Sequence, residues 1–133
     1  MKRKIMAVTL TAAMLAGLAA VPVWADDTGS DEGKVLNIYC WNEEFKSRLT
    51  DHYPGYEEVD GTHGKIGDVD VVWNITPSDD NAYQNNLDET LLKQADASAD
   101  DKIDLFLVEA DYALKYVNTD YTMPVADLGI TED

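Results

Sequence analysis

The sequence predicts an α/β protein whose parallel sheet begins β-α-β-α-β, and three observations carry this prediction. Residues 35–41, 69–75 and 103–108 each have the composition of a strand. Helical patterns separate these segments, which favours parallel strands joined by right-handed crossovers. The third segment is apolar on both parities apart from Asp104, as in strands covered on both faces. We therefore expect 103–108 to be a central or near-central buried strand.

The first 25 residues are expected to form a signal peptide that is cleaved after Ala25. A basic start at 2–4 precedes an apolar run over 5–20, and small residues stand at the cleavage positions. Acidic residues follow from Asp26, so retention as a membrane helix is the weaker interpretation. We expect export to the periplasm or the extracellular space.

Residues 26–33 are polar and are expected to form a flexible leader before the folded part. No cysteine stands near Ala25, so no lipid anchor is evident at the signal boundary. The only cysteine, Cys40, excludes a disulfide framework and a thiolate metal cluster, and we expect it to be a small core residue. His52 and His63 lack partners at metal-ligand spacing, so neither a metal nor a cofactor is expected.

Charge excludes some partners. The chain has 26 acidic and 10 basic residues and a formal net charge of -16. Nucleic acids and anionic membrane surfaces would be repelled by such a chain, whereas neutral and cationic ligands remain possible. The alternative is that the charge only keeps the surface solvated.

The first predicted strand, 35–41, ends at Asn42, which is a plausible N-cap for a helix with Phe45 and Leu49 on its apolar side. Residues 56–68 are polar and rich in glycine, and we expect a loop that can contain a short hairpin arm. The glycines in this stretch do not form a P-loop, because no GK[ST] sequence opens a helix.

The second predicted strand, 69–75, leads into a helix with an apolar stripe. The residues on this stripe are Tyr83, Leu87, Leu91 and Ala95, widened by Leu92. Asp79 and Asp80 are candidate caps for this helix, and Asp111 is a candidate cap for a short helix after the third strand. Residues 123–128 are expected to be extended or to form a turn.

Polar and aromatic residues follow the first and third predicted strands, where open α/β sheets bind ligands. These residues are Trp41, Asn42 and Glu43 after the first strand, and Glu109, Asp111 and Tyr112 after the third. Carboxylates and amides can bind the hydroxyls of a polyol, and aromatic rings can stack on its apolar faces. Two nearby carboxylates can instead perform acid–base catalysis. A third interpretation is purely structural: Glu109 ends a strand, Asp111 caps a helix, and Trp41 and Tyr112 fill the core.

Four blocks of the sequence resemble the N-terminal part of extracellular solute-binding proteins of family 1, the sugar-type binding proteins of ABC importers. These blocks are KVLNIYCWNEEF, ITPSDDNAYQNNLDETLLKQ, DDKIDLFLVEADYALKYV and PVADLGIT, which together span most of 34–133. The resemblance implies a periplasmic-binding-protein-like lobe of a two-lobed protein that closes on a carbohydrate or related solute and delivers it to membrane permease subunits. It also implies ligand contacts from the six residues just named, with Tyr83 as a further candidate.

Members of that family have several hundred residues, so the resemblance implies that 34–133 is a partial, truncated N-terminal lobe. The lipobox cysteine of Gram-positive members is missing here. We expect a binding protein and not an enzyme, since the sequence has no nucleophile elbow or metal-ligand cluster. The alternatives are a secreted carbohydrate-active hydrolase, a carbohydrate-binding module, or an inactive fragment.

Overall fold

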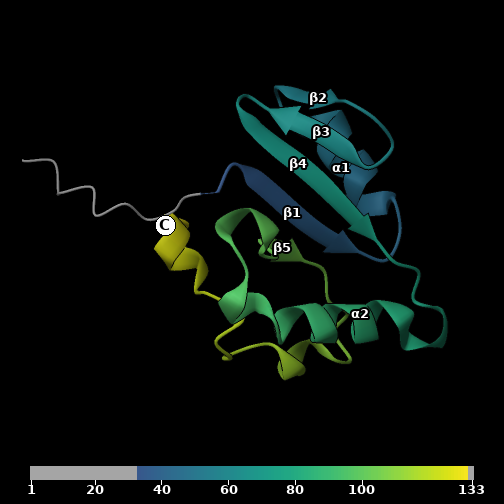
Figure 1. Cartoon of the computed structure of the whole chain (residues 1–133), viewed down its shortest axis with the longest axis vertical. Coiled ribbons are helices and arrows are strands. Elements are labelled where there is room, and N and C mark those ends of the chain that lie inside the picture. Colours follow the sequence, from purple (N-terminus) through teal and green to yellow (C-terminus); the bar gives the residue numbers. More distant parts are fainter. Residues whose placement is uncertain (1–32, 132–133) are drawn as a thin grey trace, which may run out of the picture. The chain divides into compact units, whose positions relative to one another are not determined.

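The computed structural model describes residues 33–131, which form an α/β arrangement around one mixed sheet (Figure 1). The predicted signal peptide and nearly all of the predicted leader lie outside the described residues. Among the described residues, none of the helices has the length and apolar character needed to cross a membrane.

The sheet has five strands in the order β2-β3-β4-β1-β5 (Figure 1). The strands are β1 (Val35–Cys40), β2 (Tyr56–Glu58), β3 (His63–Ile66), β4 (Val69–Ile75) and β5 (Leu105–Phe106). β4, β1 and β5 are parallel, whereas β2 and β3 form an antiparallel hairpin that pairs with β4. The α/β class is therefore confirmed, and the expected parallel strands are present, but the sheet as a whole is mixed because the hairpin adds two antiparallel strands.

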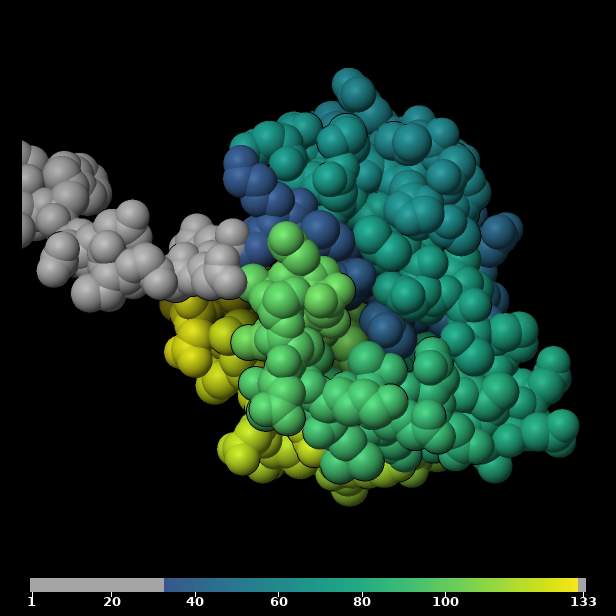
Figure 2. All heavy atoms as spheres, viewed as in Figure 1, coloured from purple at the N-terminus to yellow at the C-terminus, as the bar shows by residue number. Residues whose placement is uncertain are grey.

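Two α-helices cover the sheet: α1 (Glu44–His52) and α2 (Ala82–Leu91). Short 3₁₀ helices connect and follow them: η1 (Asp79–Asn81), η2 (Gln94–Asp96), η3 (Ala99–Asp101), η4 (Ala113–Lys115) and η5 (Val125–Leu128). Figure 2 shows the atoms of the residues that follow α2, in light green, beside those of β1, in dark blue, on this face of the molecule.

Successive side chains of β1 point to opposite faces of the sheet, and a separate core cluster lies on each face. Ile38 and Cys40 pack on the face that carries Phe45 and Leu49 of α1, while Tyr39 packs against α2 on the other face. The α2 side is built on the buried residues Tyr83, Leu87, Leu91, Ile103 and Tyr116. The predicted helical stripe is thus confirmed at Tyr83, Leu87 and Leu91 but not at Ala95, which is exposed in η2, and the predicted burial of Cys40 is confirmed.

The prediction for the third strand, 103–108, differs most from the structure. Only Leu105 and Phe106 pair with β1, so β5 is a two-residue strand at the edge of the sheet and not a central one. Leu105 is 37% exposed and Val108 is 36% exposed. An apolar run indicates burial but does not say how many neighbouring strands surround it, because helices can cover the faces while one edge stays open.

Helix stripes and caps also differ from expectation. Leu92 is 74% exposed and does not widen the stripe, since α2 ends at Leu91. The N-cap position of α1 is Glu43, although Asn42 Oδ1 accepts a hydrogen bond of 3.0 Å from the Glu44 N–H.

The predicted aspartate caps are also absent. Asp79 and Asp80 lie within η1, and the N-cap of α2 is Asn81, without a side-chain bond. Asp111 does not cap η4, whose N-cap is Tyr112.

The expected hairpin arm is present as β2 and β3, and it is held against α1. Lys46 is almost fully buried, and its Nζ donates a hydrogen bond of 2.7 Å to Gly61 O in the hairpin turn. Across the hairpin, the Tyr56 ring lies over Gly64, and its hydroxyl receives a 3.0 Å hydrogen bond from Trp73 Nε1. An added Cβ at Gly64 would lie only 2.6 Å from Tyr56 Cε2.

Gly64→Ala should therefore lower the free energy of unfolding by about 1–3 kcal/mol, because a methyl group there displaces the Tyr56 ring. Urea denaturation measures the change. Gly61→Ala is the matched control, since an added Cβ there meets nothing within 4 Å. Equal stability of the two variants would contradict this packing.

Side chains hold β5 against β1. The Asn37 N–H donates to Asp104 Oδ2 at 2.7 Å, and Asn37 Nδ2 donates to the backbone carbonyls of Asp100 and Lys102 at 2.8 and 2.9 Å. Burial raises the pKa of the Asp104 carboxyl above its usual value, although the hydrogen bond from Asn37 opposes this effect.

A raised folded-state pKa means that folding favours protonated Asp104, so the residue's contribution to stability declines as the pH rises through that pKa. Asp104→Asn removes this titration. The unfolding free energy of the variant minus that of the wild type should increase as the pH rises from about 3.9, the ordinary pKa of an aspartate, and should level off above the folded-state pKa, as measured by urea denaturation. A difference that is constant or decreasing over this range would contradict the shift.

Candidate ligand-binding site

The parallel strands β4, β1 and β5 end at one edge of the sheet, and a polar pocket of about 200 Å³ lies where the chain leaves β4 and β5. Its lining comes from the β4–α2 connection, the first turn of α2 and the segment after β5. The lining residues are Ser78, Asn81, Tyr83, Gln84, Glu109, Asp111 and Tyr112. Four residues singled out in the sequence thus surround one pocket, which we call the rim pocket.

The residues that follow β1 lie elsewhere on the same edge. Trp41 and Asn42 line a separate pocket of about 190 Å³, formed with α1 and Leu107. Glu43 is exposed and is not among the lining residues of either pocket. Five of the six predicted contacts that follow β1 and β5 are therefore divided between two neighbouring hollows, and Glu43 lines neither.

Trp41 lies between these hollows. Its ring packs edge-on against Tyr83, with 5.5 Å between the ring centroids. The indole is half-buried against the core cluster on the α2 side. This position contributes packing to the rim, and it also leaves part of the ring accessible to solvent.

Tyr83 is the most buried residue of the rim pocket, with 1% of its surface exposed. Its hydroxyl donates to Leu107 O at 2.7 Å and lies 3.1 Å from Tyr39 O. Burial raises the pKa of this phenol, so it stays protonated and remains a donor. The hydroxyl is engaged with the backbone, which makes Tyr83 a residue that shapes the pocket.

Glu109, Asp111 and Tyr112 form the outer side of the rim pocket. Both acids are exposed, while Tyr112 is half-buried. Burial raises the pKa of Tyr112, and the negative charges of Glu109 and Asp111 raise it further. All three residues line the same pocket.

Sequence reasoning missed Ser78, Asn81 and Gln84. They follow β4, whose carboxyl end lies at the same edge as those of β1 and β5, so the rule that selected the other residues applies to them too. Asp80 and Asn81 both have positive φ, 51° and 59°, in a backbone region that aspartate and asparagine tolerate better than most residues. The run of Asp and Asn before α2 was the available signal.

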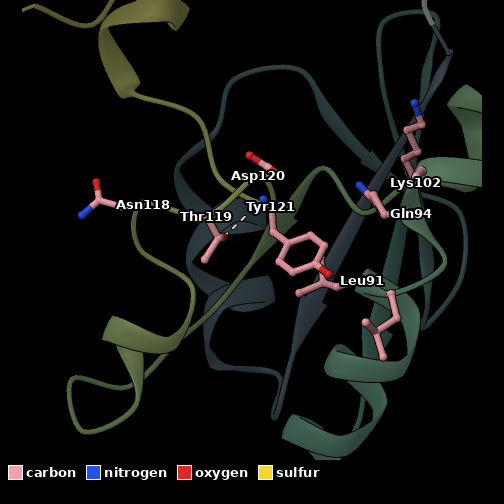
Figure 3. A pocket seen from close by; sticks show the side chains of 9 residues that line it. Leu91, Gln94, Lys102, Asn118, Thr119, Asp120 and Tyr121 are labelled. Carbon is pink, nitrogen blue, oxygen red and sulfur yellow. Dashed lines mark hydrogen bonds between the residues drawn. The ribbon is translucent and has the colours of Figure 1, made fainter.

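A larger hollow lies at the other end of α2. It has a volume of about 620 Å³ and is lined by the C-terminal end of α2, by η2 and by 118–121. Figure 3 shows the Tyr121 ring turned toward Leu91, whereas the Asn118 side chain points away from that ring. The polar groups of this hollow do not converge on one point, so it is a weaker candidate for recognition of a polar solute.

Within the described residues, no group of three or more His, Cys, Asp or Glu side chains is placed to hold a metal ion. Comparisons with protein-family models, curated proteins and solved structures found no match. The chemistry of the rim pocket is therefore the basis for a functional hypothesis.

Tyr83→Phe should lower the free energy of unfolding by about 1–3 kcal/mol, because Leu107 O loses its phenolic donor in a buried setting. Urea denaturation measures the loss. Tyr53→Phe is the control, since Tyr53 is 50% exposed. Losses of the same size in both variants would rule out a special role for the Tyr83 hydroxyl.

Proposed function

We propose that this chain belongs to the binding lobe of an exported solute-binding protein, which captures a carbohydrate or a related small solute for an ABC permease. The observation that carries the proposal is the rim pocket, where Tyr83, Glu109, Asp111 and Tyr112 meet at the carboxyl edge of the parallel strands. The permease and the periplasmic-binding-protein-like lobe enter the proposal through the sequence resemblance.

The pocket lining suits a hydroxylated solute. Carboxylate oxygens of Glu109 and Asp111 accept hydrogen bonds from hydroxyl groups, and the amides of Asn81 and Gln84 both donate and accept. The half-buried ring of Tyr112 offers an apolar surface for the face of a sugar ring. Each chemical feature of a small polyol therefore has a complementary group.

The size of the pocket supports a two-walled site. Its volume of about 200 Å³ is below the range of roughly 300–1,000 Å³ that is typical of complete ligand pockets. Both acids on its outer side are exposed to solvent. In the proposed function a second lobe closes over this side and supplies the remaining contacts, as in hinge-closing binding proteins.

NMR titration tests this proposal, since it detects the weak binding expected of a single wall. The purified chain is titrated with neutral monosaccharides, disaccharides and polyols and with their amine-bearing counterparts. We expect saturable shifts of the backbone amides of Ser78, Gln84 and Asp111, with dissociation constants on the order of 1 mM.

Tyr112→Ala should weaken this binding by about 1–3 kcal/mol while the chain stays folded, because the solute loses its aromatic contact. Tyr53→Ala removes an exposed tyrosine elsewhere and should not change the affinity. Absence of shifts at the rim pocket with every solute would refute the proposal. Cleavage of a glycoside by the wild type, lost in Glu109→Gln, would assign the chain to the hydrolases instead.

A further inference from the structure

The rim pocket carries two negative charges and no positive one. Among its seven lining residues, Glu109 and Asp111 are acidic and none is basic. Neither acid takes part in the ion pairs between described residues. Both carboxylates therefore face the pocket without a cationic partner from residues 33–131.

Most basic residues of the described part are engaged elsewhere. The pairs are Lys34–Asp68, Lys46–Glu58, Arg48–Glu44, Lys65–Asp70 and Lys115–Asp88. The remaining lysines, Lys93 and Lys102, do not line the rim pocket. A positive charge that meets these two carboxylates therefore has to come from a ligand, because no described basic side chain lines the pocket.

The N-terminus of α2 opposes this negative charge only in part. Tyr83 and Gln84 place the first turn of α2 at the pocket, and a helix N-terminus is equivalent to roughly half a positive elementary charge. Two ionised carboxylates outweigh it. The net charge of -16 on the whole chain further favours cations near its surface.

We infer that the solute of the rim pocket is a small hydroxylated molecule with a protonated amine, such as an amino sugar or an amino alcohol. This inference rests on the proposed function and narrows its ligand class. The ammonium group donates up to three hydrogen bonds to the oxygens of Glu109 and Asp111. The Tyr112 ring adds a cation–π contact, and the amides of Asn81 and Gln84 bind the hydroxyl groups.

Matched pairs of solutes test this inference in NMR titrations of the purified chain at about pH 6, where alkyl amines are protonated. The pairs are glucosamine with glucose, galactosamine with galactose, and 2-aminopropane-1,3-diol with glycerol. N-acetylglucosamine is added because it keeps the nitrogen without its charge. At least one amine should bind about tenfold more tightly than its neutral partner, and an increase in salt from about 0.05 to 0.5 M should reduce this preference.

Two amide variants locate the effect. Glu109→Gln and Asp111→Asn should each reduce the preference for the amine, because each removes one negative charge with little change in shape. Glu57→Gln and Asp127→Asn make the same chemical changes at exposed positions outside the pocket, and they should leave the preference unchanged.

The outcomes separate this inference from the proposed function. Neutral solutes that bind as tightly as their amine partners would overturn the amine inference and leave the proposed function standing. If the control variants weaken the preference for amines as much as the pocket variants do, the preference comes from the overall charge of the chain. That result would also overturn the inference. Binding of no solute at the rim pocket would overturn both.

Discussion

The contact on which the carboxyl edge of the sheet depends is that of the Tyr83 hydroxyl with Tyr39 O, near the end of β1, and with Leu107 O, just after β5. Leu107 donates its N–H to Tyr39 O at 3.0 Å, and the Tyr83 hydroxyl donates to Leu107 O. One phenol from α2 therefore closes the ladder at the point where the two strands separate. Trp41 packs on the same ring, so the position of α2, the first β–α turn and the segment after β5 are linked through one buried side chain.

Side chains also replace the backbone ladder that so short an edge strand lacks. Gln94 donates to Ile103 O at 2.8 Å and accepts from the Ile103 N–H at 2.9 Å, as a neighbouring strand would. Asn37 and Asp104 make equivalent contacts on the β1 side. Only two residue pairs join β5 to β1. The amide and carboxylate contacts therefore help to hold β5 in place, and with it the segment that follows β5.

Local patterns predicted the elements better than their arrangement. The apolar, β-branched segments gave β1 and β4 nearly to the residue, and the helical spacing predicted the buried side of α2. The hairpin was weaker in the sequence because β2 and β3 expose glutamates and a lysine, and β3 contains Gly64. The edge position of β5 depends on which strands are neighbours, and no local pattern records that. Glu109, Asp111 and Tyr112 were found because they follow a strand, and the same rule applied to the end of β4 would have found Asn81, which lines the same pocket.

Burial divides the residues of the rim pocket into those that hold its shape and those that can meet a solute. Tyr83 is buried and satisfied by the backbone, while Glu109 and Asp111 are exposed, so their charges are hydrated when no ligand is present. Enclosure of the pocket would remove that water, and an unpaired carboxylate out of water is strongly unfavourable. A ligand that brings a positive charge relieves this penalty, whereas a neutral ligand of the same size leaves most of it in place. The same two acids can therefore favour cationic solutes and disfavour neutral ones, because specificity depends on the difference between the two affinities.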